Sequence, residues 1–403
     1  MPYIKRLIQP IFEKVLAQNK SIMLLGPRQT GKTTLVEELI ETDLSYSFLE
    51  SSVRRRFEED PGLLIAEIKG LIQSKKMKKR PLVFVDEIQK IPQIMDTIQL
   101  AIDKKLANFI LTGSSLRKLR RKKKDVNLLP GRVIELNLGG LTLLELGDDI
   151  YPNLEDLLLN GALPEIILQK DSQCKELLLT SYVNIYLEEE IRAEAHVQNL
   201  ASFSRFLTYA AVDAGKQLNV TNLSREIGVS RHTIEEYYQI LQDCLIADRI
   251  EPIVKSTTRR RLTKAPKYLL FDLGIRRIAA SEGLRLPQKY LGDLFEQFIG
   301  IEILNLIKIF APQAKCYYWR DHTGPEVDYI IEFNRQYLPI EVKWTSKPTR
   351  SDGKHLLSFM KEYDCAVPAY IVCQTPKTME IERDIIAIGW KEISAVIRDF
   401  LSA

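Results

Sequence analysis

Residues that commonly bind metal ions or form crosslinks are scarce in this 403-residue sequence, which has four histidines and five cysteines. None of the cysteines belongs to a CxxC pair; they are Cys174, Cys244, Cys316, Cys365 and Cys373. Structural zinc sites need four closely grouped Cys or His ligands, so zinc binding is not expected. We interpret the cysteines as buried thiols in a reducing compartment.

Long apolar runs are also absent. No segment reaches membrane-spanning length, and the first residues, MPYIKRLIQPIFEKV, lack the hydrophobic core of a signal peptide. The content of 45% hydrophobic and 27% charged residues is typical of a globular protein. We therefore expect a cytoplasmic protein of two or three domains with no membrane partner.

The net charge of +4 gives no overall argument for binding nucleic acid. The basic residues are, however, concentrated in KKMKKR (75–80), RKLRRKKK (117–124) and KSTTRRRLTKAPK (255–267). Each segment alone is consistent with a solvated loop. Three together favour an anionic partner such as DNA.

The segment SIMLLGPRQTGKTTLVEELI (21–40) contains a complete G-x-x-x-x-G-K-T motif between an apolar strand and an amphipathic helix. Backbone N–H groups of such a loop close around phosphates. Lys32 would contact the β- and γ-phosphates, and the Thr33 hydroxyl would ligate Mg²⁺. The predicted ATP-binding residues here are Gly26, Pro27, Arg28, Gln29, Thr30, Gly31, Lys32, Thr33 and Thr34.

Two further strands end in polar residues. The segment PLVFVDEIQKIP predicts a buried strand that ends in the acids Asp86 and Glu87. Asp86 could hold Mg²⁺ through water, and Glu87 could polarise the attacking water. ANFILTGSS ends in Thr112 and Ser114, and Ser114 could touch the γ-phosphate or simply form a turn. Alternating strands and helices predict a parallel sheet with helices on both faces. Together these motifs predict ATP hydrolysis with Mg²⁺, with Lys32 and Glu87 as catalytic residues.

In this order, GPRQTGKTTL, VFVDEIQ, FILTGSS and LPGRVIELNL resemble motifs of bacterial and archaeal AAA-type ATPases fused to a C-terminal domain of unknown function. The resemblance covers nearly the whole chain. It implies a nucleotide-sensing or finger role for Arg132, which from the sequence alone could equally cap a turn. It also makes GALPE (161–165) similar to the Gly-x-Pro element of signal-transducing ATPases. Because AAA-type sites often lie at subunit interfaces, it further implies a homo-oligomer.

From about residue 156 the periodicity becomes helical. The segment LNVTNLSREIGVSRHTIEEYYQIL predicts two helices joined at Gly228, with the second beginning after Ser230, as in a helix-turn-helix. The basic segment 255–267 follows where a β-wing belongs. A DNA reader of this kind would use Arg231 and His232 on the second helix, and its wing would contact phosphates through Arg259, Arg260 and Arg261. The alternative is a winged helix that packs inside the ATPase and does not touch DNA.

The C-terminal part predicts a helix, three strands, a helix and a strand, which is the core order of restriction-endonuclease-like folds. Its first helix, LGDLFEQFIGIEILNLIKIF (291–310), carries Glu296, and the strands carry Asp328, Glu341 and Lys343. These residues fit the pattern D-x(n)-(D/E)-x-K, and the alternation of a strand places Glu341 and Lys343 on one face.

This pattern has two readings. As a nuclease site, Glu296, Asp328 and Glu341 would hold Mg²⁺, and Asp328, Glu341 and Lys343 would be catalytic. A buried salt bridge between Lys343 and one of the acids would give the same sequence, and a fold does not by itself establish cleavage.

The sequence thus predicts an α/β protein in three parts: a P-loop AAA-type ATPase domain (1–155), a helical region with a winged helix (156–285) and a restriction-endonuclease-like domain (286–403). The first functional hypothesis is an ATPase that acts on DNA through a nuclease domain gated by nucleotide. The second is a regulatory ATPase switch whose C-terminal domain binds protein or nucleic acid without cleaving it. Both require ATP or ADP and Mg²⁺.

Overall fold

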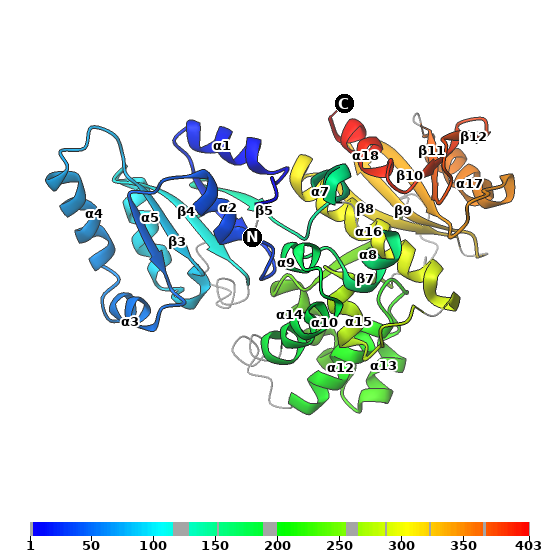
Figure 1. The fold of residues 1–403 in the computed structure, drawn as a ribbon, viewed down its shortest axis with the longest axis horizontal. Helices are drawn as coiled ribbons and strands as arrows, with labels where there is room; N and C mark the ends of the chain where they lie inside the picture. The colour runs from blue at the N-terminus through cyan, green and yellow to red at the C-terminus, as the bar shows by residue number, and fades with distance from the viewer. Residues whose placement is uncertain are drawn as a thin grey trace. The chain divides into compact units, whose positions relative to one another are not determined.

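The computed structural model describes residues 3–115, 129–150, 153–187, 200–254, 265–286, 288–321, 324–365 and 368–402. The chain divides into two compact units (Figure 1). The first comprises residues 1–139 with 243–245, and the second comprises 140–242 with 246–403.

The first unit is built on a five-stranded parallel sheet with the order β2-β3-β4-β1-β5. Its strands are β1 (Ser21–Leu25), β2 (Leu44–Ser47), β3 (Leu82–Asp86), β4 (Asn108–Gly113) and β5 (Val133–Asn137). The helices are α1 (Gln9–Ala17), α2 (Lys32–Leu39), α3 (Ser51–Glu59), α4 (Leu63–Ser74), the 3-10 turn η1 (Ile88–Lys90) and α5 (Ile94–Asp103).

Helices cover both faces of this sheet, as the sequence predicted. On β1, Met23 and Leu25 pack in one hydrophobic cluster with residues of α4 and α5. Ile22 and Leu24 point to the opposite face and pack with residues of α1 and α2. A strand buried on both faces explains why β1 reads as a continuous apolar run. Since β3, β4 and β1 are neighbours, their carboxyl ends meet at one edge of the sheet.

The second unit begins with helices. They are α7 (Leu143–Ile150), α8 (Leu154–Asn160), α9 (Pro164–Leu168), α10 (Ser172–Ser181), the π-helix η2 (Tyr182–Leu187), α12 (Leu200–Val212), α13 (Val220–Ile227), α14 (Arg231–Asp243) and α15 (Leu273–Ala279). The two helices predicted around Gly228 are α13 and α14. Gly228 ends α13 in the left-handed conformation, with a φ of 80°. The Thr233 N–H donates to the Ser230 hydroxyl at 3.0 Å, which caps α14.

The rest of this unit forms an eight-stranded sheet with the order β12-β13-β11-β10-β9-β8-β6-β7. The strands are β6 (Ala247–Pro252), β7 (Lys267–Leu270), β8 (Lys315–Arg320), β9 (Glu326–Phe333), β10 (Gln336–Val342), β11 (Ala369–Cys373), β12 (Met379–Glu382) and β13 (Ile385–Gly389). The accompanying helices are η3 (Gln288–Tyr290), α16 (Leu291–Phe310), η4 (Arg350–Gly353), α17 (Lys354–Tyr363) and α18 (Ile393–Ser402). The predicted order of helix, three strands, helix and strand is present as α16, β8, β9, β10, α17 and β11.

The sheet crosses the boundary that the sequence suggested between residues 285 and 286. β6 and β7 form the antiparallel hairpin expected of a wing, but β6 also pairs in parallel with β8. The hairpin therefore shares main-chain hydrogen bonds with the C-terminal strands, and both parts belong to one compact unit. Within the described ranges, no helix is long and apolar enough to cross a membrane.

Candidate functional site

The P-loop follows the carboxyl end of β1 and is held in a tight curve. A Cβ atom on Gly26 would lie 2.1 Å from the Leu138 carbonyl oxygen, so only glycine fits there. Gly31 begins α2 with a φ of 88°, which favours glycine. The buried Lys32 Nζ donates to the carbonyl oxygens of Gly26 and Pro27 at 2.8 Å each. The ammonium group therefore lies inside the curve of the loop.

The other predicted residues of the loop lie around this curve. The Thr30 hydroxyl donates to the Pro27 carbonyl at 2.8 Å. Gln29 has a left-handed φ of 57° and is exposed, as is Thr34 on the first turn of α2, whereas Arg28 is half-buried.

Asp86 joins the P-loop to two neighbouring strands. The Thr33 hydroxyl donates to Asp86 Oδ1 at 3.1 Å, and the Thr112 hydroxyl at the end of β4 donates to the same oxygen. Burial raises the pKa of Asp86, an effect that the hydrogen bonds from Thr112 and Thr33 and the charge of Lys32 only partly offset. The predicted Mg²⁺ ligands Thr33 and Asp86 are thus in direct contact.

Glu87, the predicted catalytic base, belongs to a buried hydrogen-bond network. Its backbone has a left-handed φ of 56°, and its N–H donates to the Thr112 hydroxyl at 3.2 Å. The Ser114 hydroxyl donates to Glu87 Oε2 at 3.0 Å. Gln89 Nε2 donates to both, at 2.5 Å to Glu87 Oε2 and 2.9 Å to Ser114 Oγ. Ser114 therefore holds the Glu87 carboxylate in place, and Gln89, to which the sequence assigned no role, completes the network.

Arg6 is a second residue of this site that sequence reasoning missed. The residue is 4% exposed, and its guanidinium donates to the Thr30 carbonyl at 2.6 Å and to the Gly139 carbonyl at 3.0 Å. It braces the P-loop against the segment that follows β5. No motif marks it, because nothing in the residue type says that this arginine is buried.

Arg132 does not lie at the P-loop of its own chain, contrary to one reading of the sequence. Val133, the next residue, pairs with Ser21 at the start of β1, whereas the P-loop follows the end of that strand. Five strand residues separate the two ends by about 17 Å. Instead, Arg132 Nε donates to Asp103 Oδ1 at 2.7 Å and its NH2 donates to Oδ2 at 3.2 Å.

The predicted C-terminal residues come together in the second unit. Asp328 on β9 accepts a hydrogen bond at Oδ2 from the Val342 N–H at 2.8 Å. Glu341 is the residue before the end of β10, and Lys343 Nζ lies 2.5 Å from its Oε1, which confirms that the two side chains share a face. Glu341 Oε2 is buried and has no hydrogen-bond partner among the residues described.

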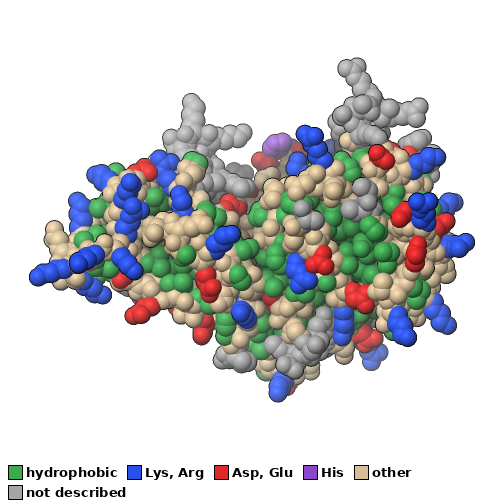
Figure 2. All heavy atoms as spheres, turned by 90° about the horizontal axis from the view of Figure 1, so that it is seen from above, with side chains coloured by type: hydrophobic (Ala, Val, Ile, Leu, Met, Phe, Trp, Pro, Cys, Tyr) green, Lys and Arg blue, Asp and Glu red, His purple; other side chains and the backbone are tan. Residues whose placement is uncertain are grey.

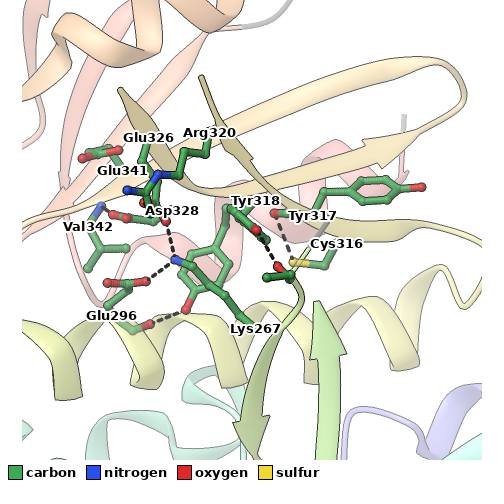
Figure 3. A network of polar contacts seen from close by, with 12 residues as sticks. Lys267, Glu296, Cys316, Tyr317, Tyr318, Arg320, Glu326, Asp328, Glu341 and Val342 are labelled. Carbon is green, nitrogen blue, oxygen red and sulfur yellow. Dashed lines mark hydrogen bonds and ion pairs between the residues drawn. The ribbon is translucent and has the colours of Figure 1, made fainter. Parts of the chain in front are cut away.

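Lys267, at the start of β7, lies within the same acidic group (Figure 3). Its Nζ is 2.8 Å from Glu326 Oε1 and 3.1 Å from Glu296 Oε1, and 5.1 Å from the ring centre of Tyr318. The residue is only 5% exposed. Neither Lys267 nor Glu326 was predicted as a site residue, because Lys267 reads in the sequence as the end of a basic segment.

Burial dominates the electrostatics of this group. It raises the pKa of Glu296 to about 7 and that of Glu341 to about 8, and the charge of Asp328 adds to both shifts. Burial also raises the pKa of Asp328, although Lys267 and Lys343 oppose the shift. For Lys267, burial lowers the pKa, but the charges of Glu296, Asp328 and Glu326 outweigh it and the pKa is raised.

The predicted Mg²⁺ ligands do not form a metal site in this arrangement. In the described part of the chain, no group of three or more His, Cys, Asp or Glu side chains is placed to hold a metal ion. One oxygen of Glu296 faces Lys267, one oxygen of Glu341 faces Lys343, and Asp328 accepts a main-chain hydrogen bond. The predicted use of Glu296, Asp328 and Glu341 as Mg²⁺ ligands therefore does not fit the observed donor set.

The predicted DNA-binding residues are only partly described. Arg231 and His232 are exposed on the first turn of α14, but the exposed Glu235 and Glu236 follow them, and His232 Nδ1 lies 3.6 Å from Glu236 Oε2. The face presented by α14 is therefore mixed in charge. The predicted wing residues Arg259, Arg260 and Arg261 lie outside the described residues, as does the basic cluster 117–124.

The basic segment 75–80, which follows α4, is described, and its Lys and Arg residues are exposed. Figure 2 shows Lys and Arg side chains gathered at the left end of the view, over the part of the first unit where Figure 1 labels α3 and α4.

Three family models match the chain in succession. Residues 18–147 match an AAA domain, residues 151–286 match a domain of unknown function (DUF8612), and residues 291–393 match another (DUF4143). The chain therefore carries an AAA domain of the P-loop type in its N-terminal part and a DUF4143 region in its C-terminal part. The AAA match supports a nucleotide-binding ATPase.

Two curated relatives are 26% identical over 336 residues, covering 82% of this chain and 71% of theirs. They are the uncharacterized proteins Rv2008c of Mycobacterium tuberculosis and Mb2031c of Mycobacterium bovis.

Solved structures give distant matches. A structure described as the basis for DNA unwinding at forked dsDNA by two coordinating Pif1 helicases has 13% identity and a TM-score of 0.26, covering 47% of this chain and 54% of that one. The Pif1 helicase of Candida albicans has 14% identity and a TM-score of 0.23, covering 46% and 48%. The chain thus spans about half the length of these helicases. Protein VC1899 of Vibrio cholerae has 9% identity and a TM-score of 0.21, covering 95% and 97%. Likeness at this level carries no functional conclusion.

Proposed function

We propose that the protein is an ATP-hydrolysing regulatory switch whose C-terminal part binds a partner without cleaving it. The observation that carries the ATPase proposal is the hydrogen-bonded convergence of Thr33, Asp86, Glu87 and Ser114 beside the P-loop. Of the two hypotheses from the sequence, the switch is favoured because Glu296, a predicted Mg²⁺ ligand, forms an ion pair with Lys267.

In this proposal each residue of the first unit has a defined task. Lys32 moves its ammonium group from the loop carbonyls to the β- and γ-phosphates. Thr33 and Asp86 would hold Mg²⁺, which neutralises the charge of the phosphates when it is bound. Glu87 orients the attacking water and accepts a proton from it as a general base. Ser114 and Gln89 keep the Glu87 carboxylate in position.

Two substitutions test this assignment. Glu87→Gln keeps the hydrogen-bonding shape but removes the base, so we expect ATP binding to persist and hydrolysis to fall by about 10²-fold or more. Lys32→Ala should abolish nucleotide binding while the fold is retained. Binding of a fluorescent ATP analogue and release of phosphate measure the two effects. Normal turnover by Glu87→Gln would mean that another residue positions the water, and normal turnover by Lys32→Ala would refute the P-loop assignment.

We propose DNA as the partner of the second unit. The succession of α13, the turn at Gly228, α14 and the β6–β7 hairpin supports a winged helix, and the basic residues 255–264 separate the two strands of that hairpin. Arg231 and His232 would approach the bases, and the arginines at 259–261 would contact phosphates. The acidic residues on α14 favour a contact that relies on the wing more than on the helix.

The DNA proposal is tested by the salt dependence of binding. Replacing Arg259, Arg260 and Arg261 together with alanine should remove up to three phosphate contacts, so the slope of log affinity against log salt should fall by up to about 3. Arg231→Ala should weaken binding less. Fluorescence anisotropy with duplex DNA provides the measurement, and an unchanged slope would exclude this surface as the DNA contact.

A further inference from the structure

Lys267 brings a cation into the acidic group from outside the C-terminal family region. It lies on β7, within residues 151–286, whereas Glu296, Glu326, Asp328 and Glu341 lie within residues 291–393. Figure 3 shows its nitrogen directed at the Glu296 carboxylate and at the carboxylates of β9. Its two ion pairs, with Glu326 at 2.8 Å and with Glu296 at 3.1 Å, make Lys267 a bridge between β9 and α16.

The position of Lys267 is fixed by its strand. Its backbone pairs with Ile250 of β6 and forms a bridge with Gln217. The side chain passes the ring of Tyr318, whose hydroxyl donates to the Ala265 carbonyl at 2.6 Å. Because a buried ammonium without partners costs several kcal/mol, a lysine that is 5% exposed at this point requires the carboxylates around it.

Lysines offset part of the negative charge of this group. Four carboxylates are present, of Glu296, Glu326, Asp328 and Glu341, and Lys267 and Lys343 face them. Arg320 adds an exposed contact of 3.5 Å to the second oxygen of Glu326. A divalent cation placed among Glu296, Asp328 and Glu341 would compete with the charge that Lys267 supplies. It would also require oxygen ligands at 2.0–2.1 Å for Mg²⁺.

We infer that Lys267 takes the place of a divalent cation, so that the second unit binds no metal ion as it stands and holds a latent metal site that loss of Lys267 would expose. The lysine supplies the positive charge that the carboxylates need, but an ammonium group has no empty coordination position and cannot activate a water molecule as a metal does. The carboxylates then hold β9, β10, α16 and β7 together. Glu341 Oε2, buried and without a hydrogen-bond partner in the described structure, provides an oxygen ligand that is ready for a metal.

The inference is tested by counting bound Mn²⁺ ions through the electron paramagnetic resonance signal of free Mn²⁺, without nucleotide. We compare wild type, Lys267→Arg, Lys267→Met and the double variant Lys267→Met/Asp328→Asn. Wild type and Lys267→Arg should bind no ion in this unit, since both retain the cation. Lys267→Met should gain one bound Mn²⁺ per chain, and the added Asp328→Asn should abolish the gain. A folded Lys267→Met that gains no ion would overturn the inference.

A second measurement uses the wild type alone, in case Lys267→Met does not fold. The thermal unfolding of wild type should be the same with Mn²⁺ as with a chelator, because no ion binds. Stabilisation by Mn²⁺ that Asp328→Asn removes would mean that a metal displaces Lys267, and it would overturn the inference. Both experiments omit ATP, so they give a result whether or not the first unit hydrolyses nucleotide.

Discussion

Buried cations hold together both groups of residues assigned here. Lys32 and Arg6 donate to main-chain carbonyls around the P-loop, and Lys267 joins two carboxylates in the second unit. Each is 6% exposed or less. At such burial a cation is tolerated only with fixed partners, so each of these side chains fixes the geometry around it.

Arg6 is expected to control ATP affinity without touching the reacting atoms. Its two donors bridge the Thr30 and Gly139 carbonyls, and an ammonium group cannot reproduce that planar fork. Arg6→Lys should therefore raise the KM for ATP by about tenfold, corresponding to one lost hydrogen bond to a charged group, with a smaller change in kcat. Steady-state kinetics of ATP hydrolysis give both parameters.

The matched control for Arg6 is Arg54→Lys. Arg54 is a half-buried arginine of the same unit that forms a surface pair with Glu58 at 3.9 Å. Surface pairs of this kind contribute little, so its kinetics should not change. An unchanged KM for Arg6→Lys would show that the P-loop does not need the planar guanidinium of Arg6 to keep its shape.

At the scale of single residues, the sequence predicted the site residues that belong to known motifs. It did not predict those whose role depends on their burial in the fold. The P-loop and the acids after β3 were predicted because residue types at fixed spacing carry their chemistry. Arg6, Gln89 and Lys267 lie in no such pattern. A lysine that ends a basic segment looks like a solvated residue, and only the strand pairing of β7 places Lys267 beneath the carboxylates.

At the scale of elements, Glu302 on α16 connects three helices of the second unit. Its Oε1 accepts hydrogen bonds from the Ser394 hydroxyl on α18 at 2.6 Å and from the Leu143 N–H at the start of α7 at 3.1 Å. The side chain is 3% exposed. Burial raises its pKa to about 7, although both hydrogen bonds favour the ionised form.

This raised pKa predicts that the second unit loses stability as the pH rises. In the unfolded chain Glu302 should titrate near its ordinary value of about 4.3. Between that value and about 7 the folded state binds the proton more tightly, so the free energy of unfolding falls as the pH increases through this window. The full difference is on the order of 4 kcal/mol, most of it lost by about pH 7. Chemical denaturation at a series of pH values measures it.

Glu302→Gln isolates this contribution, because glutamine keeps a carbonyl acceptor for Ser394 and Leu143 but does not titrate. The difference between the unfolding free energies of wild type and Glu302→Gln should change with pH over the same window. Asp399→Asn on the exposed surface of α18 is the control and should leave the pH dependence intact. A constant difference between wild type and Glu302→Gln would mean that folding does not raise the pKa of Glu302.

The elements themselves were largely predictable, whereas their grouping was not. The parallel sheet of the first unit, the two helices around Gly228 and the succession from α16 to β11 all follow from hydrophobic periodicity and turn residues. The pairing of β6 with β8 does not. It joins segments some 60 residues apart through main-chain groups, and such groups leave no signature in side-chain sequence.

At the scale of the whole molecule, the described residues of the two candidate sites belong to different units. All the described residues of the ATP site belong to the first unit, and Lys267 and the carboxylates belong to the second. No described side chain was found to serve both sites.

The homo-oligomer proposed from the resemblance to AAA-type ATPases can be tested with Arg132. Because this arginine lies at the opposite end of β1 from its own P-loop, a finger role requires the nucleotide of a neighbouring copy. The Arg132→Ala variant would then keep an intact P-loop but lack the arginine that reaches its neighbour's nucleotide. The Lys32→Ala variant would keep that arginine but lack a working P-loop. Each variant alone should be inactive, whereas a mixture of the two should regain activity. If the variants form dimers at random, about half of the dimers are mixed and each mixed dimer has one competent site of two. The activity should then reach up to about a quarter of that of wild type.

The control mixture for this experiment contains Lys32→Ala and Glu87→Gln, whose defects both lie in the P-loop site of the same chain and so cannot complement each other. Phosphate release against the mixing ratio provides the measurement. Full activity of Arg132→Ala alone would assign the arginine to its ion pair with Asp103, which joins the start of β5 to the end of α5. In that case the AAA domain would complete its site without Arg132 from any copy, and the case for an oligomer would have to rest on a direct measurement of mass in solution.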